Sequence, residues 1–340
     1  MRPIRVLVVD DSSFARELIA DVLATDKDIV LAGEAANGKE ALQKVAELKP
    51  DLVTMDIEMP VMNGLEAIEK IMALHAVPIL VVTTKSDAGT AYAAVSKGAL
   101  DLVAKPDVSI EAAHEFIAKI KMLAGIRVIT HMKGKRLVPE PGGAVKPIFS
   151  RAAGERLVAI ASSTGGPAAL SIILSALPQD FPCPVVIAQH MADGFVGGMV
   201  EWLSKGIRMK VKVASEGECL SAGTVYISPS ERHMEVGRDR KVVLTERKAN
   251  DIYRPSCDAL LRSAATVYGP DTVGVILTGM GMDGAQGMKS IKEAKGMTLA
   301  QDEKSSIVYG MNKVAVDSGC VGMILPIDRI GRELIRIVTG

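Results

Sequence analysis

Two hydrophobic patterns alternate along the first 120 residues. Five short runs are almost continuously apolar, as in strands buried on both faces of a parallel sheet: IRVLVV, DIVLAG, DLVTMD, PILVVT and ALDLVA. Apolar residues recur with helical spacing over 14–23, 39–48, 65–74, 89–97 and 110–123. Five such strand–helix units predict a doubly wound parallel α/β sheet with helices on both faces.

The same alternation restarts near residue 155. GERLVAIASS, PCPVVIAQH and DTVGVILTG have the composition of buried strands, and STGGPAALSIILSAL has that of a helix. Glycine, proline and basic residues dominate the intervening segment, which is typical of a tether. We therefore predict a first α/β domain over 1–123, a flexible basic linker over 124–152 and a second α/β domain over 153–340.

Charge and composition exclude several classes of protein. Forty basic and forty acidic residues give a net charge of zero, which argues against a general nucleic-acid binder. The charge is uneven, with −7 over 1–120, +6 over 121–152 and +1 in the remainder. No uncharged apolar run approaches membrane-spanning length, so we expect no membrane insertion. Four cysteines without a CxxC pair favour the cytoplasm over a disulfide framework or a zinc site.

Polar side chains follow the predicted strands of the first domain. Asp10 and Asp11 end the first strand and Asp56 ends the third, so three carboxylates meet at one sheet edge and invite Mg²⁺. Thr83 and Lys105 end the fourth and fifth strands. A cation and an ammonium there can neutralise phosphoryl oxygens, with Asp56 as nucleophile. The alternative is that each residue merely caps a strand or helix.

The segments VLVVDDSSFARELI, DLVTMDIEMPVMNGLE, VVTT and AKP resemble response-regulator receiver domains, which have a flavodoxin-like fold. The resemblance implies that Asp56 accepts a phosphoryl group from a sensor histidine kinase. It also implies that the three carboxylates bind Mg²⁺ and that Thr83 and Lys105 sense the phosphoryl group. Receivers commonly have an aromatic residue three positions before the lysine, where this sequence has Leu102. The usual aromatic rotation is then absent or muted.

A candidate nucleophile lies at the first strand–helix junction of the second domain. Ser163 precedes Thr164, Gly165 and Gly166, and glycines there let a substrate approach helix amides that stabilise negative charge. The G-x-S-x-G signature of α/β-hydrolases is absent, and a phosphate-binding turn is an equally possible reading of SSTGG alone.

A serine nucleophile needs a base and an orienting acid. His190 closes a strand of the second domain and is the preferred base, with His233 as the weaker candidate. Asp283 follows a third strand in a glycine-rich loop, although an aspartate there could instead be a helix N-cap. The order Ser–His–Asp differs from that of α/β-hydrolases, which points to a separate scaffold.

Six blocks of the second domain resemble the catalytic domain of chemotaxis protein-glutamate methylesterases: IASSTGGPAAL, VVIAQHM, VYISPSERHME, YRPSCDALLRSAA, VILTGMGMDGAQGM and LAQDEKSSIVYGM. The resemblance implies a Rossmann-like hydrolase that demethylates glutamate methyl esters on chemoreceptors and deamidates receptor glutamines, without a metal in this step. Ser163, His190 and Asp283 fall on the catalytic positions. Thr164 and Met280 would line the acyl site, and the 279–284 loop would supply an oxyanion donor.

The resemblance also implies that the unphosphorylated receiver covers the catalytic cleft. Met191, Ala192, Asp193 and Asn312 depart from the family's frequent prolines, and we expect them near the cleft rim. Two other functions compete with the hydrolase. A transcription factor would need a basic recognition helix, which the second half does not offer, and a nucleotide-binding module would not need His190 or Asp283.

Overall fold

A computed structural model describes residues 2–84, 88–106, 110–126, 128, 156–248 and 251–339. The chain divides into two compact units, with the boundary after residue 135. That boundary falls within the predicted 124–152 linker, most of which lies outside the described residues. No helix in the described part of the chain combines the length and the apolar character needed to cross a membrane.

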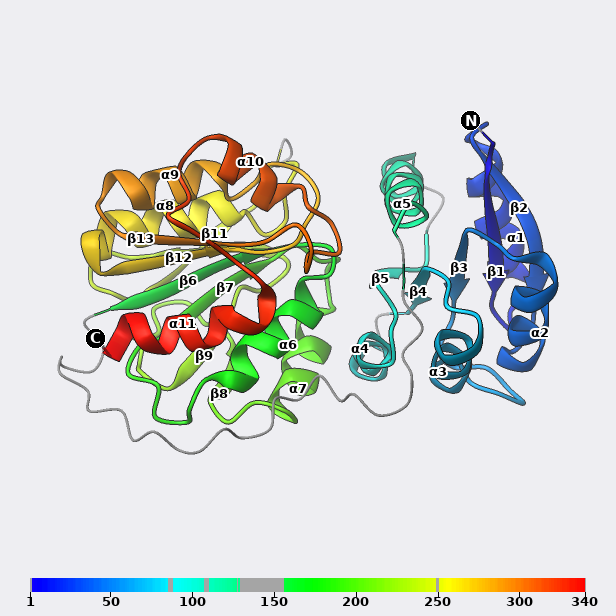
Figure 1. Cartoon of the computed structure of the whole chain (residues 1–340), viewed down its shortest axis with the longest axis horizontal. Coiled ribbons are helices and arrows are strands. Elements are labelled where there is room, and N and C mark those ends of the chain that lie inside the picture. Colours follow the sequence, from blue (N-terminus) through cyan, green and yellow to red (C-terminus); the bar gives the residue numbers. More distant parts are fainter. Residues whose placement is uncertain are drawn as a thin grey trace. The chain divides into compact units, whose positions relative to one another are not determined.

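The first unit is a five-stranded parallel sheet in the order β2-β1-β3-β4-β5, which is the flavodoxin-like order. All five predicted strand–helix units are confirmed (Figure 1). The strands are β1 (Ile4–Val9), β2 (Ile29–Ala35), β3 (Leu52–Met55), β4 (Ile79–Thr83) and β5 (Asp101–Ala104). The helices are α1 (Ser13–Ala24), α2 (Gly38–Leu48), α3 (Gly64–Leu74), α4 (Ala88–Ser96) and α5 (Ile110–Leu123).

Local sequence explains where these helices begin. Ser12, Asn37 and Asn63 each accept a hydrogen bond from a backbone amide in the first turn of α1, α2 and α3. A side chain at Gly64 would lie 2.0 Å from the carbonyl oxygen of Asp56, so only glycine allows α3 to start this close to β3. The loop after β3 is thereby held against the acidic edge of the sheet.

The second unit contains a seven-stranded sheet in the order β14-β13-β12-β6-β7-β9-β8, and all of its pairings are parallel. Its strands are β6 (Leu157–Ser162), β7 (Val185–Gln189), β8 (Lys210–Val213), β9 (Thr224–Ile227), β12 (Thr272–Ile276), β13 (Met297–Gln301) and β14 (Met323–Leu325). Its helices are α6 (Gly166–Ala176), α7 (Val196–Ser204), α8 (Cys257–Tyr268), η2 (Gly269–Asp271), α9 (Ala285–Glu293), α10 (Met311–Asp317) and α11 (Ile327–Thr339).

Helices cover both faces of this sheet, as the sequence predicts (Figure 1). Alternate residues of β6 pack toward a core that includes α8 and α9, where Leu260 and Met288 are fully buried. On the other face α6 packs against α11, and Gly331 allows the close approach of these two helices. Burial on both faces explains why β6 is apolar at nearly every position.

A two-stranded antiparallel sheet lies outside the predicted pattern. It is formed by β10 (Arg232–Val236), which is mostly buried, and β11 (Val242–Glu246), in which only Val242 is buried. His233, the weaker candidate base, lies inside β10.

Both large sheets have a topological switch point. In the first unit β1 lies between β2 and β3, and in the second unit β6 lies between β7 and β12. The crevice at the carboxyl ends of such strands is where open α/β sheets bind ligands. The carboxyl ends of β1 and β6 are therefore the two places where this fold favours a binding or catalytic site.

Candidate active site

Ser163 lies directly after β6 and at the start of α6, and is 8% exposed. Its backbone amide donates to the carbonyl of Thr278 at 3.1 Å, which fixes the chain between β6 and the extension of β12. Gly165 adopts φ 76°, a left-handed conformation that favours glycine, so the chain can turn into α6. Ser163 is thus presented by a tight strand–helix turn at the switch point.

Register brings Ser163 beside His190. Ser162 pairs with Gln189 across β6 and β7, so Ser163 and His190 are the next residues on two neighbouring strands. The amide of His190 also donates to the carbonyl of Ser162 at 3.0 Å. Among the described residues, however, no hydrogen bond joins the Ser163 hydroxyl to His190.

Gln189 holds these two strand ends together, and it is not among the residues that the sequence predicts for the site. Its side-chain amide donates to the carbonyls of Ser163 and His190, each at 2.8 Å, and its oxygen accepts from Ser162 at 2.6 Å. Gln189 is 3% exposed and Ser162 is fully buried. The sequence does contain an indication of this role, because Gln189 is the one polar residue of the apolar strand β7 and stands at its end. Ser162 therefore has a structural partner, which distinguishes it from Ser163.

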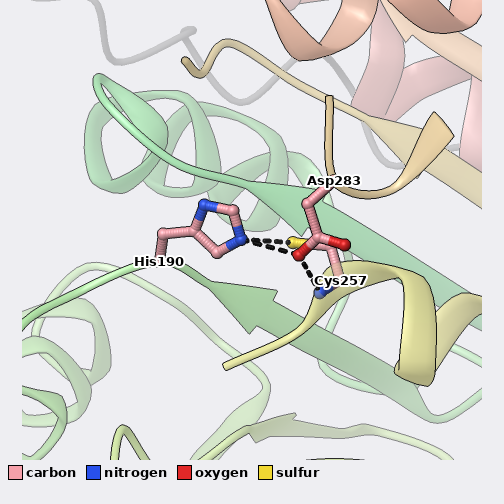
Figure 2. Close-up of side chains that lie close together, drawn as sticks. All are labelled: His190, Cys257 and Asp283. Atoms are coloured by element: carbon pink, nitrogen blue, oxygen red, sulfur yellow. Dashed lines mark hydrogen bonds and ion pairs between the residues drawn. The ribbon is translucent and has the colours of Figure 1, made fainter. Parts of the chain in front are cut away.

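His190 and Asp283 form an ion pair or hydrogen bond of 2.9 Å between Nε2 and Oδ2 (Figure 2). Asp283 also accepts backbone hydrogen bonds from Cys257, Asp258 and Gly284 at 2.6, 2.9 and 3.1 Å. Burial alone would raise the pKa of Asp283, but the hydrogen bond from His190 and those from the amides of Asp258 and Cys257 lower it below its ordinary value. The carboxylate is therefore charged and fixed in orientation.

Asp283 is not the N-cap of the helix that follows it. Gly284, with φ 94°, is the N-cap of the following helix α9. Asp283 instead satisfies the first amides of α8, a helix that precedes it in the sequence. The carboxylate is therefore buttressed by the start of α8 while it contacts His190.

Aromatic stacking gives His190 a further support. The rings of His190 and Tyr253 lie 5.2 Å apart between centroids and are inclined by 12°. Tyr253 was not among the residues expected in the site, because an isolated tyrosine in a loop carries no signal for stacking on a distant histidine. Its hydroxyl also accepts a hydrogen bond from the amide of Met282 at 3.4 Å, which ties it to the loop that carries Asp283.

His233, the weaker candidate base, is engaged elsewhere. Its Nε2 lies 2.8 Å from Asp251, and its Nδ1 accepts a hydrogen bond from the amide of Ser256 at 2.9 Å. Both ring nitrogens therefore hold the segment that leads into α8. A histidine with two occupied nitrogens cannot also take a proton from a nucleophile.

The other predicted site residues differ in exposure. Met280 is 47% exposed, whereas Thr164 is buried and its carbonyl accepts a hydrogen bond from the Thr278 hydroxyl. Asp193 forms a bidentate ion pair with Arg247. The expectation that Asn312 lies at a cleft rim is wrong: it is fully buried and donates to the carbonyl of Gln301 and the hydroxyl of Ser306. Its amide needs these partners because no water reaches it.

The first unit gathers its predicted residues at the end of β1. Asp10, Asp11 and Asp56 each offer a carboxylate oxygen, and these oxygens all lie within 4.8 Å of one another. Lys105 forms ion pairs of 2.7 Å with Asp10 and 2.8 Å with Asp56. Burial lowers the pKa of Lys105, but the two carboxylates outweigh it and raise the pKa overall. Burial, aided by the charge of Asp10, raises the pKa of Asp56.

These residues fit the magnesium ion that a receiver domain uses. Three carboxylates with a single ammonium leave excess negative charge, and hard oxygen donors are the ligands that Mg²⁺ prefers. The buried hydroxyl of Thr83 has no hydrogen-bond partner among the described residues, so it is available to a phosphoryl oxygen. Leu102 is buried in β5, where the usual aromatic residue is missing.

Comparisons with known proteins cover both units. The family model for the response regulator receiver domain matches residues 6–117, and that for CheB methylesterase matches 158–334. A "Protein-glutamate methylesterase/protein-glutamine glutaminase 3" of Paramagnetospirillum magneticum is 47% identical, with 99% of this chain and 96% of the relative covered. A relative of the same activity name from Pyrococcus horikoshii is 40% identical, with coverage of 99% and 94%.

The second unit is also similar to a solved structure. The CheB methylesterase catalytic domain of Thermotoga maritima is 37% identical, with a TM-score of 0.53, and the match covers 55% of this chain and 100% of that one. The competing readings of SSTGG as a nucleotide-binding turn and of the second half as a transcription factor thereby lose their basis.

Proposed function

Because this chain belongs to the CheB methylesterase family of response regulators, we propose that it hydrolyses methyl esters of glutamate side chains on chemoreceptors and deamidates receptor glutamines. The activity is that of a chemotaxis adaptation enzyme activated by phosphorylation of the receiver. Its relatives carry both activities in their names and align over nearly their whole length. The proposed phosphodonor is a sensor histidine kinase of the chemotaxis type, and the proposed location is the cytoplasm.

The 2.9 Å contact between His190 and Asp283, beside the strand end that presents Ser163, carries the proposed mechanism. With Nε2–H donated to Asp283, Nδ1 of His190 is the nitrogen left to accept a proton from Ser163. The serine oxygen then attacks the glutamyl carbonyl, and His190 returns the proton to the departing methanol or ammonia. Water hydrolyses the acyl-enzyme by the same route and releases a glutamate carboxylate.

The negative charge that develops on the carbonyl oxygen needs fixed donors. In this proposal such donors come from backbone amides at the start of α6 and in the 279–284 loop. Thr164 and Met280 line the acyl site in the same proposal. A side chain at Gly279 would lie 2.6 Å from Cβ of Ser163, so this loop passes directly against the nucleophile.

In the receiver, Asp10, Asp11 and Asp56 would hold Mg²⁺, which neutralises the phosphoryl oxygens during transfer to Asp56. Lys105 offsets the remaining charge, and the Thr83 hydroxyl offers a hydrogen bond to a phosphoryl oxygen. These interactions give the phosphorylated receiver contacts that the unphosphorylated receiver lacks. Such differential contacts can shift a conformational equilibrium that controls the esterase.

The decisive experiment measures methanol release from methylated receptor membranes. Ser163→Ala should lower the rate by about 10⁴-fold or more, since the nucleophile is lost while positioning remains. Ser162→Ala is the matched control, because it removes the neighbouring hydroxyl that binds Gln189. A serine-reactive phosphonate should label a peptide containing Ser163. Full activity of Ser163→Ala, or labelling at another serine, would remove the assignment.

A further inference from the structure

Three side chains of different chemistry, those of His190, Cys257 and Asp283, converge in the second unit (Figure 2). His190 Nε2, Cys257 Sγ and a carboxylate oxygen of Asp283 all lie within 4.8 Å of one another. Nε2 is 3.4 Å from the sulfur and 2.9 Å from the carboxylate oxygen. The three residues come from the end of β7, the first turn of α8 and the loop before α9, so only the fold unites them.

The ligand types match Zn²⁺ and exclude hard cations. Imidazole nitrogen, thiolate sulfur and carboxylate oxygen are the donors zinc uses, at bond lengths of about 2.0–2.3 Å. Tetrahedral coordination with such bonds separates ligand atoms by roughly 3.3–3.8 Å. The nitrogen–sulfur separation already falls in this range, and the nitrogen–oxygen separation must open by only a few tenths of an ångström.

The surroundings also favour a cation. Asp283 is 3% exposed, and a second carboxylate residue, Asp258, lies against it and donates its backbone amide to the Asp283 side chain at 2.9 Å. Within the described residues, no lysine or arginine forms a salt bridge with either carboxylate. Backbone amides hold Asp283 in place, and the Tyr253 ring holds His190, so the ligands are supported as they are in known metal sites.

We propose that His190, Cys257 and Asp283 bind Zn²⁺ and that this ion inhibits the hydrolase reversibly. Binding forms a zinc–sulfur bond, and the thiol proton passes to solvent. Zinc on Nε2 of a neutral imidazole leaves the ring proton on Nδ1. His190 then has no lone pair to accept the proton of Ser163, and Asp283 no longer orients it. The inhibitory effect rests on the proposed serine mechanism, whereas the metal site itself does not.

The test uses the full chain, stripped of metal with a chelator and assayed by methanol release over a series of Zn²⁺ concentrations in excess Mg²⁺. Wild type should be inhibited, and Cys257→Ala and Cys257→Ser should need at least about tenfold more Zn²⁺ for half-inhibition. Each variant is compared with its own zinc-free rate. Cys320→Ala, which removes another buried free cysteine, should respond as wild type does.

Cobalt binding provides a readout that does not depend on activity. Co²⁺ added to Ser163→Ala should produce thiolate-to-cobalt charge-transfer absorption, which disappears when Cys257→Ser is added to that variant. The receiver acids contain no sulfur and cannot produce this band. Absence of the band, or equal zinc inhibition of wild type and both Cys257 variants, would overturn the site. A cobalt band together with an active Ser163→Ala enzyme would retain the metal site and reject the serine mechanism.

Discussion

The two units place different chemistry at the same point of the same kind of sheet. In the receiver, three carboxylates and Lys105 meet at the carboxyl end of β1, whereas in the catalytic unit Ser163, His190 and Asp283 follow β6 and its two neighbours. The receiver edge holds more negative charge than its ammonium neutralises. At the catalytic edge, the single carboxylate of Asp283 accepts hydrogen bonds from backbone amides and contacts the imidazole of His190. The topological switch point gives both sheets a crevice, and the charged and polar side chains at that crevice determine which reaction each unit carries out.

After loss of the nucleophile itself, the largest expected effect comes from the acid of the catalytic unit. Asp283→Asn keeps the size of the side chain but cannot stabilise protonated His190, so kcat should fall by about 10³–10⁴-fold. Phosphorylation of Asp56 by acetyl phosphate should be unaffected in this variant. Methanol release and phosphoryl incorporation, measured on one preparation, check both statements. A catalytic loss accompanied by loss of phosphorylation would contradict the separation of the two sites.

The next effect isolates the receiver. Asp56→Asn removes the phosphoacceptor, so acetyl phosphate and Mg²⁺ should no longer raise the rate of methanol release, while the basal rate persists. The fragment 153–340 should exceed the unphosphorylated full chain, because the resemblance implies that the receiver inhibits it. Lys105→Arg is the companion variant, since it retains charge beside Asp56 but changes its geometry. Equal rates of fragment and full chain would remove inhibition by the receiver.

A smaller effect is expected from Gln189, which holds the ends of β6 and β7 together in the catalytic unit. Gln189→Leu leaves the carbonyls of Ser163 and His190 without their donor, so unfolding free energy should fall by about 2–3 kcal/mol and kcat should fall with it. Ser162→Ala removes one partner of the same side chain and should cost about 1 kcal/mol. Urea unfolding and methanol release measure both. A stable, fully active Gln189→Leu protein would show that this network does not position the site.

The smallest effect concerns the segment that carries Tyr253. The hydrogen bond from His233 lowers the pKa of Asp251 below 3.8, so this group stabilises the fold above that pH and loses its contribution as pH falls through the folded-state pKa. Asp251→Asn should therefore reduce the urea midpoint slightly near neutral pH. The difference from wild type should shrink as the pH falls below 3.8. A difference independent of pH would indicate that the carboxylate charge is not responsible.

Continuous apolar runs predicted both sheets, because strands buried on two faces need apolar residues at nearly every position. The polar residues that end those runs predicted the candidate sites, since the carboxyl ends of parallel strands share one edge. The β10–β11 hairpin was missed, because its two strands are short and contain several polar residues, as loop sequences do. Asn312 was misplaced, because its sequence position gave no indication that Gln301 and Ser306 would enclose it.

The sequence by itself determined the two α/β units, the carboxylates of the receiver edge and the residue types of the Ser–His–Asp set. Isolated cysteines argued against a zinc site, but that argument considers only spacing along the chain. Tertiary structure alone brought Cys257 to His190, gave Asp283 the amides of α8 and occupied both nitrogens of His233. These contacts depend on strand order and on packing between segments far apart in sequence. Local hydrophobic patterns predict neither the strand order nor this long-range packing.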